Sequence, residues 1–88
     1  MKFIKIKDKT TYKIKSLNVD DNNIEIDLFD GEKLKITIEK VCYCGNGNFM
    51  LKVDNDYRYI ISELTEELIA YFNYTYEIVL LNYTALEN

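Results

Sequence analysis

Apolar residues recur at every second position in short runs over the first sixty residues, and clusters of Asp, Asn and Gly separate the runs. This alternation is typical of β-strands with one face buried and one face in solvent. The runs cover residues 2–7, 12–19, 24–29, 33–44, 49–53 and 57–61. A further run, 75–83, is apolar on both faces and predicts a last strand, either central or at a covered edge.

The breaks between the runs predict tight turns. Asp30-Gly31 is the strongest hairpin signal in the chain, since this pair favours a two-residue turn with positive φ. Residues 20–23 and 45–48 are also rich in turn formers. The apolar phase slips by one residue near Ser16 and again after Ile38, and a slip of one residue moves side chains to the other face. We therefore expect a β-bulge near Ser16.

The period changes to that of a helix between Ser62 and Asn73. Ser62 is the predicted N-cap, and acidic residues follow it, which suits the positive end of a helix dipole. The predicted buried face comprises Leu64, Leu68, Tyr71 and Phe72. The chain is thus expected to be one α+β domain, with six or seven short antiparallel strands in a twisted sheet or partly closed barrel and one helix near the C-terminus. The pattern does not give the strand order.

Charge is unevenly distributed along the chain, whose net charge is −4. Residues 1–15 contribute +5 and the rest −9. The basic part carries Lys2, Lys5, Lys7, Lys9, Lys13 and Lys15, interleaved with Phe3 and Tyr12. Lysines with aromatic rings can hold nucleic acid, whereas lysines on an edge hairpin also prevent sheet-to-sheet pairing. Because nucleic-acid-binding proteins are more often basic overall, we expect direct nucleic-acid binding to be the less favoured alternative.

The acidic groups suggest a different surface. Glu25 and Asp27 share one strand face, and acids in the adjoining turns extend it. Carboxylates attract Lys and Arg as phosphates do, so this surface could occupy a basic groove of another protein. The alternative is a solvated face that keeps the protein in solution. The predicted partner-binding residues are Asp20, Asp21, Glu25, Asp27, Asp30 and Glu32, with Tyr57 and Tyr59 as interface aromatics.

The sequence offers little for catalysis. It has no His, and therefore neither Ser nor Cys has the usual general base. Cys42 and Cys44 alternate on one strand, which is poor disulfide geometry, and two thiols do not complete a zinc site unless a second chain supplies the others. Buried structural thiols are the simpler interpretation. We expect no enzyme activity, cofactor or metal within one chain.

These observations favour a non-enzymatic protein-binding module. Lysines interrupt the apolar N-terminus, and no stretch is long and apolar enough to span a membrane, so a cytoplasmic protein is expected. The small size, the acidity and the abundance of Lys, Asn, Ile and Tyr suggest an accessory protein of a phage or mobile element. Such a protein, of the anti-CRISPR kind, would inhibit a host nuclease or defence complex. The alternatives are a self-associating assembly subunit, such as a homodimer, and nucleic-acid binding by the basic hairpin.

Overall fold

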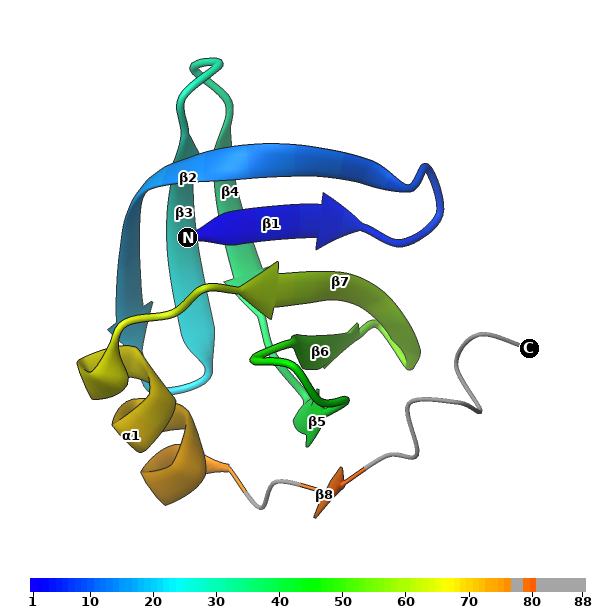
Figure 1. The fold of residues 1–88 in the computed structure, drawn as a ribbon, viewed down its shortest axis with the longest axis vertical. Helices are drawn as coiled ribbons and strands as arrows, with labels where there is room; N and C mark the ends of the chain where they lie inside the picture. The colour runs from blue at the N-terminus through cyan, green and yellow to red at the C-terminus, as the bar shows by residue number, and fades with distance from the viewer. Residues whose placement is uncertain (77–78, 81–88) are drawn as a thin grey trace.

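The computed structural model describes residues 1–76 and 79–80 (Figure 1). Within these residues, seven antiparallel strands and a short eighth strand form one sheet that does not close into a barrel, and one helix lies between the seventh and eighth strands. The elements are β1 (Lys2–Lys5), β2 (Thr10–Asp20), β3 (Asn23–Leu28), β4 (Lys33–Thr37), β5 (Lys40–Tyr43), β6 (Phe49–Val53), β7 (Asp56–Ser62), α1 (Glu66–Thr75) and β8 (Val79–Leu80). The strand order is β4-β3-β2-β1-β7-β6-β5-β8, with β8 parallel to β5. The predicted α+β class is confirmed.

The long strand β2 joins two halves of the sheet. Its first residues pair with β1 and its later residues pair with β3. The register shifts between Ile14 and Ser16, so the predicted bulge is present. Beyond it, β3 and β4 run across β1 and β7 at a steep angle (Figure 1), and the two halves therefore enclose a common core.

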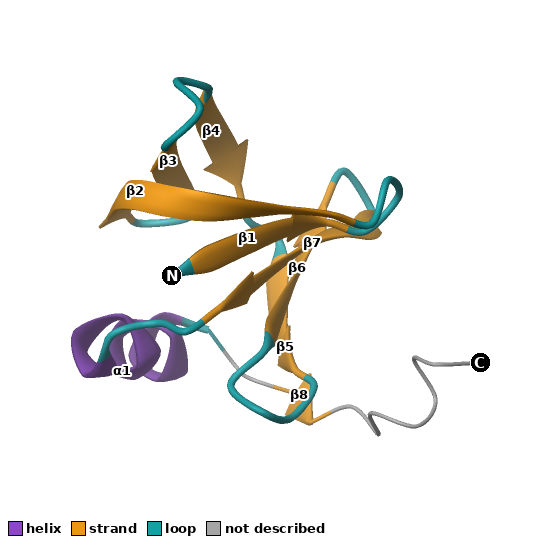
Figure 2. Cartoon of the chain, turned by 45° about the horizontal axis from the view of Figure 1, so that its top comes forward, coloured by secondary structure: helices purple, strands orange, loops and turns teal. Residues whose placement is uncertain are grey.

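The core joins alternate residues of both halves. Its fully or nearly fully buried members are Phe3, Ile14, Ile24, Ile26, Leu28, Ile36, Ile38, Val41, Phe49, Leu51, Ile61 and Phe72. Phe72 is the one residue of this set that comes from α1, and its ring stacks on Phe49 with the centroids 5.9 Å apart. The helix lies beside one end of the sheet (Figure 2), where Phe72 completes the core.

The helix begins later than the sequence predicts. Ser62 is the last residue of β7, where it pairs with Lys2, and it is therefore not the N-cap. The chain turns at Glu63, whose φ is +56°, and Thr65 is the true cap, because its side chain accepts a hydrogen bond from the Leu68 N–H. The helix ends at Thr75 rather than Asn73. Within the described residues, no helix is long and apolar enough to cross a membrane.

The predicted last strand is described only in part. Residues 79–80 form β8 at the edge of the sheet, beside β5, whereas Thr75 belongs to α1 and Tyr76 is its C-cap. The rest of that prediction, residues 77–78 and 81–83, lies outside the described residues.

Candidate binding surfaces

The outer face of the β2–β3–β4 half, which points away from the core, is polar throughout. Register pairs give three rows: Ser16–Asp27–Lys33, Asn18–Glu25–Lys35 and Asp20–Asn23–Thr37. Glu25 and Asp27 do share this face, as predicted. Each stands directly opposite a lysine of β4, however, and opposite charges at such positions attract. The face is therefore mixed in charge at its β4 side rather than uniformly negative.

Three of the six predicted acidic residues already have partners within the protein. The Asp27 carboxylate accepts a 3.1 Å hydrogen bond from the Ser16 hydroxyl at the bulge. Asp30 accepts a 2.9 Å bond from the Glu32 N–H and so closes the β3–β4 turn. The Glu32 carboxylate lies 3.2 Å from the Lys5 ammonium. These three carboxylates stabilise the fold, and partner binding would have to compete with those contacts.

The other three, Asp20, Asp21 and Glu25, form what we call the acidic patch. All three are exposed and lie at or near the β2–β3 turn, whereas Asp30 lies in the β3–β4 turn at the other end of β3. Asp20 and Glu25 line a shallow pocket with Asn18, Asn23 and Lys35. Among the described residues, no hydrogen bond or ion pair engages the three carboxylates. They are thus the predicted acids that are available to a partner.

The helix holds the turn that carries the acidic patch. Asp21 has a φ of +50°, and its carbonyl oxygen accepts hydrogen bonds from Tyr71 (2.9 Å) and Tyr76 (3.3 Å). Burial, with smaller contributions from Tyr71 and Asp21, raises the pKa of Tyr76 to about 12. Its hydroxyl is therefore a stable donor at neutral pH. No local pattern in the sequence indicates this anchor, because fifty or more positions separate its members.

The two predicted interface tyrosines pack against different clusters. Tyr59 pairs with Leu51 and Tyr57 pairs with Lys52, so Arg58 is an extra residue in β7. This bulge places Tyr59 against the main core and Tyr57 against a second cluster. Simple alternation along β7 would put Tyr57 and Tyr59 on one face, but the bulge at Arg58 turns them to different faces.

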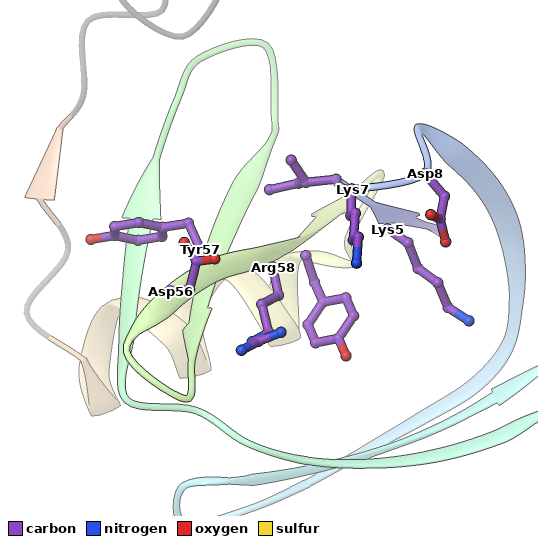
Figure 3. Close-up of a pocket in the computed structure, with 8 residues that line it drawn as sticks. Lys5, Lys7, Asp8, Asp56, Tyr57 and Arg58 are labelled. Atoms are coloured by element: carbon purple, nitrogen blue, oxygen red, sulfur yellow. The ribbon is translucent and has the colours of Figure 1, made fainter.

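A groove lies between the β1–β2 turn and the β6–β7 hairpin (Figure 3). Its lining residues are Lys5, Ile6, Lys7, Asp8, Asp56, Tyr57, Arg58 and Tyr59. The hydrogen bond to Glu32 raises the pKa of Lys5, whose ammonium also lies 5.0 Å from the Tyr12 ring centroid. The Arg58 Nε–H donates a 2.9 Å bond to the Val53 carbonyl. Two of the three cations in the groove therefore already have partners within the protein.

The basic hairpin presents few open aromatic surfaces. Phe3 is completely buried, and Tyr59 stacks on it at 4.9 Å between centroids. Tyr12 packs against the core and lies under Lys5. Because base stacking needs an accessible ring face, neither predicted aromatic is placed for it.

The cysteines are buried, unbridged thiols, as the simpler interpretation held. The Cys42 sulfur lies 2.9 Å from the Tyr57 hydroxyl oxygen, and the Cys44 thiol donates to the Asn48 carbonyl at 3.4 Å. Burial raises the pKa of Cys44, which keeps its thiol protonated and poorly nucleophilic. Within residues 1–76 and 79–80, no three His, Cys, Asp or Glu side chains are grouped as metal ligands.

The chain matches no protein family, no curated protein and no solved structure.

Proposed function

We propose that this protein is a non-enzymatic, cytoplasmic protein-binding module that presents its acidic patch to a basic surface of another protein. The observation that carries the proposal is the exposed set Asp20, Asp21 and Glu25, whose carboxylates have no partner within the described chain. A basic groove that normally holds nucleic acid is the complementary surface, because carboxylates and phosphates bind the same Lys and Arg side chains.

Pre-organisation supports this proposal. The two tyrosine hydroxyls that bind the Asp21 carbonyl fix the turn to the helix, so the patch loses little conformational entropy when a partner binds. Carboxylates placed in this way mainly accelerate association and select the partner, since they steer a basic surface into position. An accessory protein of a phage or mobile element that inhibits a host nuclease or defence complex would act by competing with nucleic acid for that basic groove.

The test begins with capture from a lysate of the source cell or its host, after nuclease treatment, and identification of bound proteins by mass. The purified partner is then titrated with the wild-type protein and with Asp20→Lys/Glu25→Lys. We expect affinity to fall by at least about tenfold, because charge reversal places like charges at the interface. We choose Asp20 rather than Asp27 as the second site because Asp27 holds Ser16 at the bulge.

Asp8→Lys/Asp56→Lys is the matched control, since it makes the same charge change at two exposed acids of the groove. Urea unfolding of each variant establishes that it is folded. Equal affinity of the wild type and the patch variant would refute the site, and so would an equal loss in the control. Recovery of nucleic acid alone, or of this chain alone, would favour the basic hairpin or self-association instead.

A further inference from the structure

The outer face of the other half of the sheet carries an unexpected apolar row. Register pairs join Ile4 to Ile60, Ile60 to Met50, and Met50 to Cys42 across β1, β7, β6 and β5. Directly paired residues point to the same side of a sheet. We call these four residues the outer row. Ile4 and Ile60 are half-buried, whereas Met50 and Cys42 form a buried floor.

The outer row lies on the side away from the main core. Its members Cys42, Met50 and Ile60 belong to a second cluster, which includes Ile6, Cys44 and Tyr57 but no residue of α1, β3 or β4. The helix covers a different part of the sheet (Figure 2). Within the described residues, no second layer packs on this face, and Ile4 and Ile60 are only partly buried.

Lysines flank the outer row on both sides. Lys2 pairs with Lys13 on one side, and Lys40 pairs with Lys52 on the other. Their positions in the register place all four on the face of the outer row. The Lys2 ammonium lies 3.3 Å from the Glu63 carboxylate. No ion pair engages Lys13, Lys40 or Lys52 within the described chain. These lysine pairs surround an apolar stripe with positive charge.

We propose that the outer row is a docking site for an acidic protein segment with apolar side chains. Those side chains would rest on Ile4 and Ile60, and flanking Asp or Glu residues would pair with the lysines on either side. Like charges directly opposite on neighbouring strands repel, and carboxylates between them would relieve this repulsion. The small accessible area predicts a weak, transient complex.

The chemistry of the row disfavours two other occupants. Single-stranded nucleic acid binds through open aromatic platforms, but the four residues of the row are aliphatic or sulfur-containing. The ring of Tyr57, which belongs to the second cluster, is covered by the Lys52 ammonium 6.0 Å from its centroid. A second copy of this chain could offer its acidic patch, yet the rows around that patch contain no apolar residue to cover Ile4 and Ile60. An acidic segment of a different protein is therefore the occupant that fits both the charge and the apolar surface.

The test is a selection of random peptides displayed on phage against the full folded protein. The enriched peptides are then synthesised and titrated by fluorescence polarisation. We expect a consensus of aliphatic residues flanked by Asp or Glu. Lys13→Glu/Lys40→Glu should weaken binding by at least about tenfold, and added salt should weaken binding to the wild type. Lys7→Glu/Lys9→Glu is the matched control, with the same charge change in the exposed β1–β2 turn.

A second variant, Ile60→Thr, tests the apolar contact and keeps a β-branched side chain in the strand. It should weaken peptide binding while circular dichroism shows the native fold. The proposal is overturned if no peptide is enriched, if the consensus is basic, or if the control Lys7→Glu/Lys9→Glu loses as much affinity as Lys13→Glu/Lys40→Glu. Binding of oligothymidylate in place of peptides, or a dimer that Ile60→Thr dissociates, would also overturn it. The acidic patch is unchanged in these variants, so its test is independent.

Discussion

Replacing Phe72 by Ala tests how the helix is held on the sheet. Phe72 is fully buried, stacks on Phe49 at 5.9 Å, and meets Tyr71 edge-on at 6.1 Å. Truncating a buried Phe to Ala costs about 3–5 kcal/mol, through lost transfer free energy and the cavity that remains. A domain of this size has a total stability of roughly 4–13 kcal/mol, so the variant loses a large share of it.

The assay is urea unfolding at 25 °C followed by circular dichroism, together with thermal unfolding. A loss of 4 kcal/mol corresponds to a midpoint lower by roughly 15–30 °C for a domain of this length. If Phe72→Ala does not fold, Phe72→Leu gives a measurable value, since a swap that keeps most of the volume costs less than about 1.5 kcal/mol.

Tyr74 provides the matched control on the same helix. Its side chain is 94% exposed, so Tyr74→Ala should change stability by no more than about 0.5 kcal/mol. Aromatic-to-Ala changes raise helix propensity similarly at both sites, and the difference between the variants therefore reports packing. A difference below about 1 kcal/mol would refute the packing of α1 on the sheet through Phe72.

Two further predictions follow from the cap and from the tyrosine hydroxyls. Thr65→Ala should lower the free energy of unfolding by about 1 kcal/mol in urea titrations, more than Ser62→Ala does, and the reverse order would place the start of the helix at Ser62. The pKa values of Tyr57, through its hydrogen bond with Cys42, and Tyr76, through burial, are raised from 10.0 to about 12. Since the unfolded chain loses these protons first, stability should be fully present below pH 10 and fall as pH rises towards 12. Tyr57→Phe/Tyr76→Phe should flatten that fall, and an equally steep profile in the variant would contradict the assignment.

Local signals predicted much of the fold. The alternation of apolar residues located the strands, Asp30-Gly31 located the β3–β4 turn, and the phase slip located the bulge at Ser16. Each of these features depends on neighbours within a few residues, where side-chain and backbone preferences act directly.

Features set by pairing partners were not predictable in this way. The sequence shows an unbroken alternation of tyrosine and arginine over residues 57–59. Nevertheless, β7 has a bulge there, because its register against Leu51 and Lys52 shifts. Ser62 resembles a cap, but pairing with Lys2 extends β7 through it. The strand order likewise depends on contacts between distant segments.

The candidate site was predicted only in part for the same reason. The sequence groups six acids within one short segment, and the structure divides them between two ends of a hairpin. Glu32 is neutralised by Lys5, which lies 27 positions away, and Asp27 serves the bulge at Ser16. Of the six, Asp20, Asp21 and Glu25 have no partner within the described chain. This division was not predictable, because no local pattern shows which carboxylates the fold itself will use.

The outer row shows most clearly why topology is needed to find a surface. Its four residues come from four strands, and in the sequence each one reads as an ordinary apolar strand residue. Only the register reveals that they point away from the core and that lysine pairs flank them. The acidic patch belongs to the β2–β3 hairpin of the other half. Since the two surfaces share no residue, a basic partner and an acidic partner could bind the same molecule. Asp20→Lys/Glu25→Lys would then weaken binding of the basic partner alone, and Lys13→Glu/Lys40→Glu binding of the acidic partner alone.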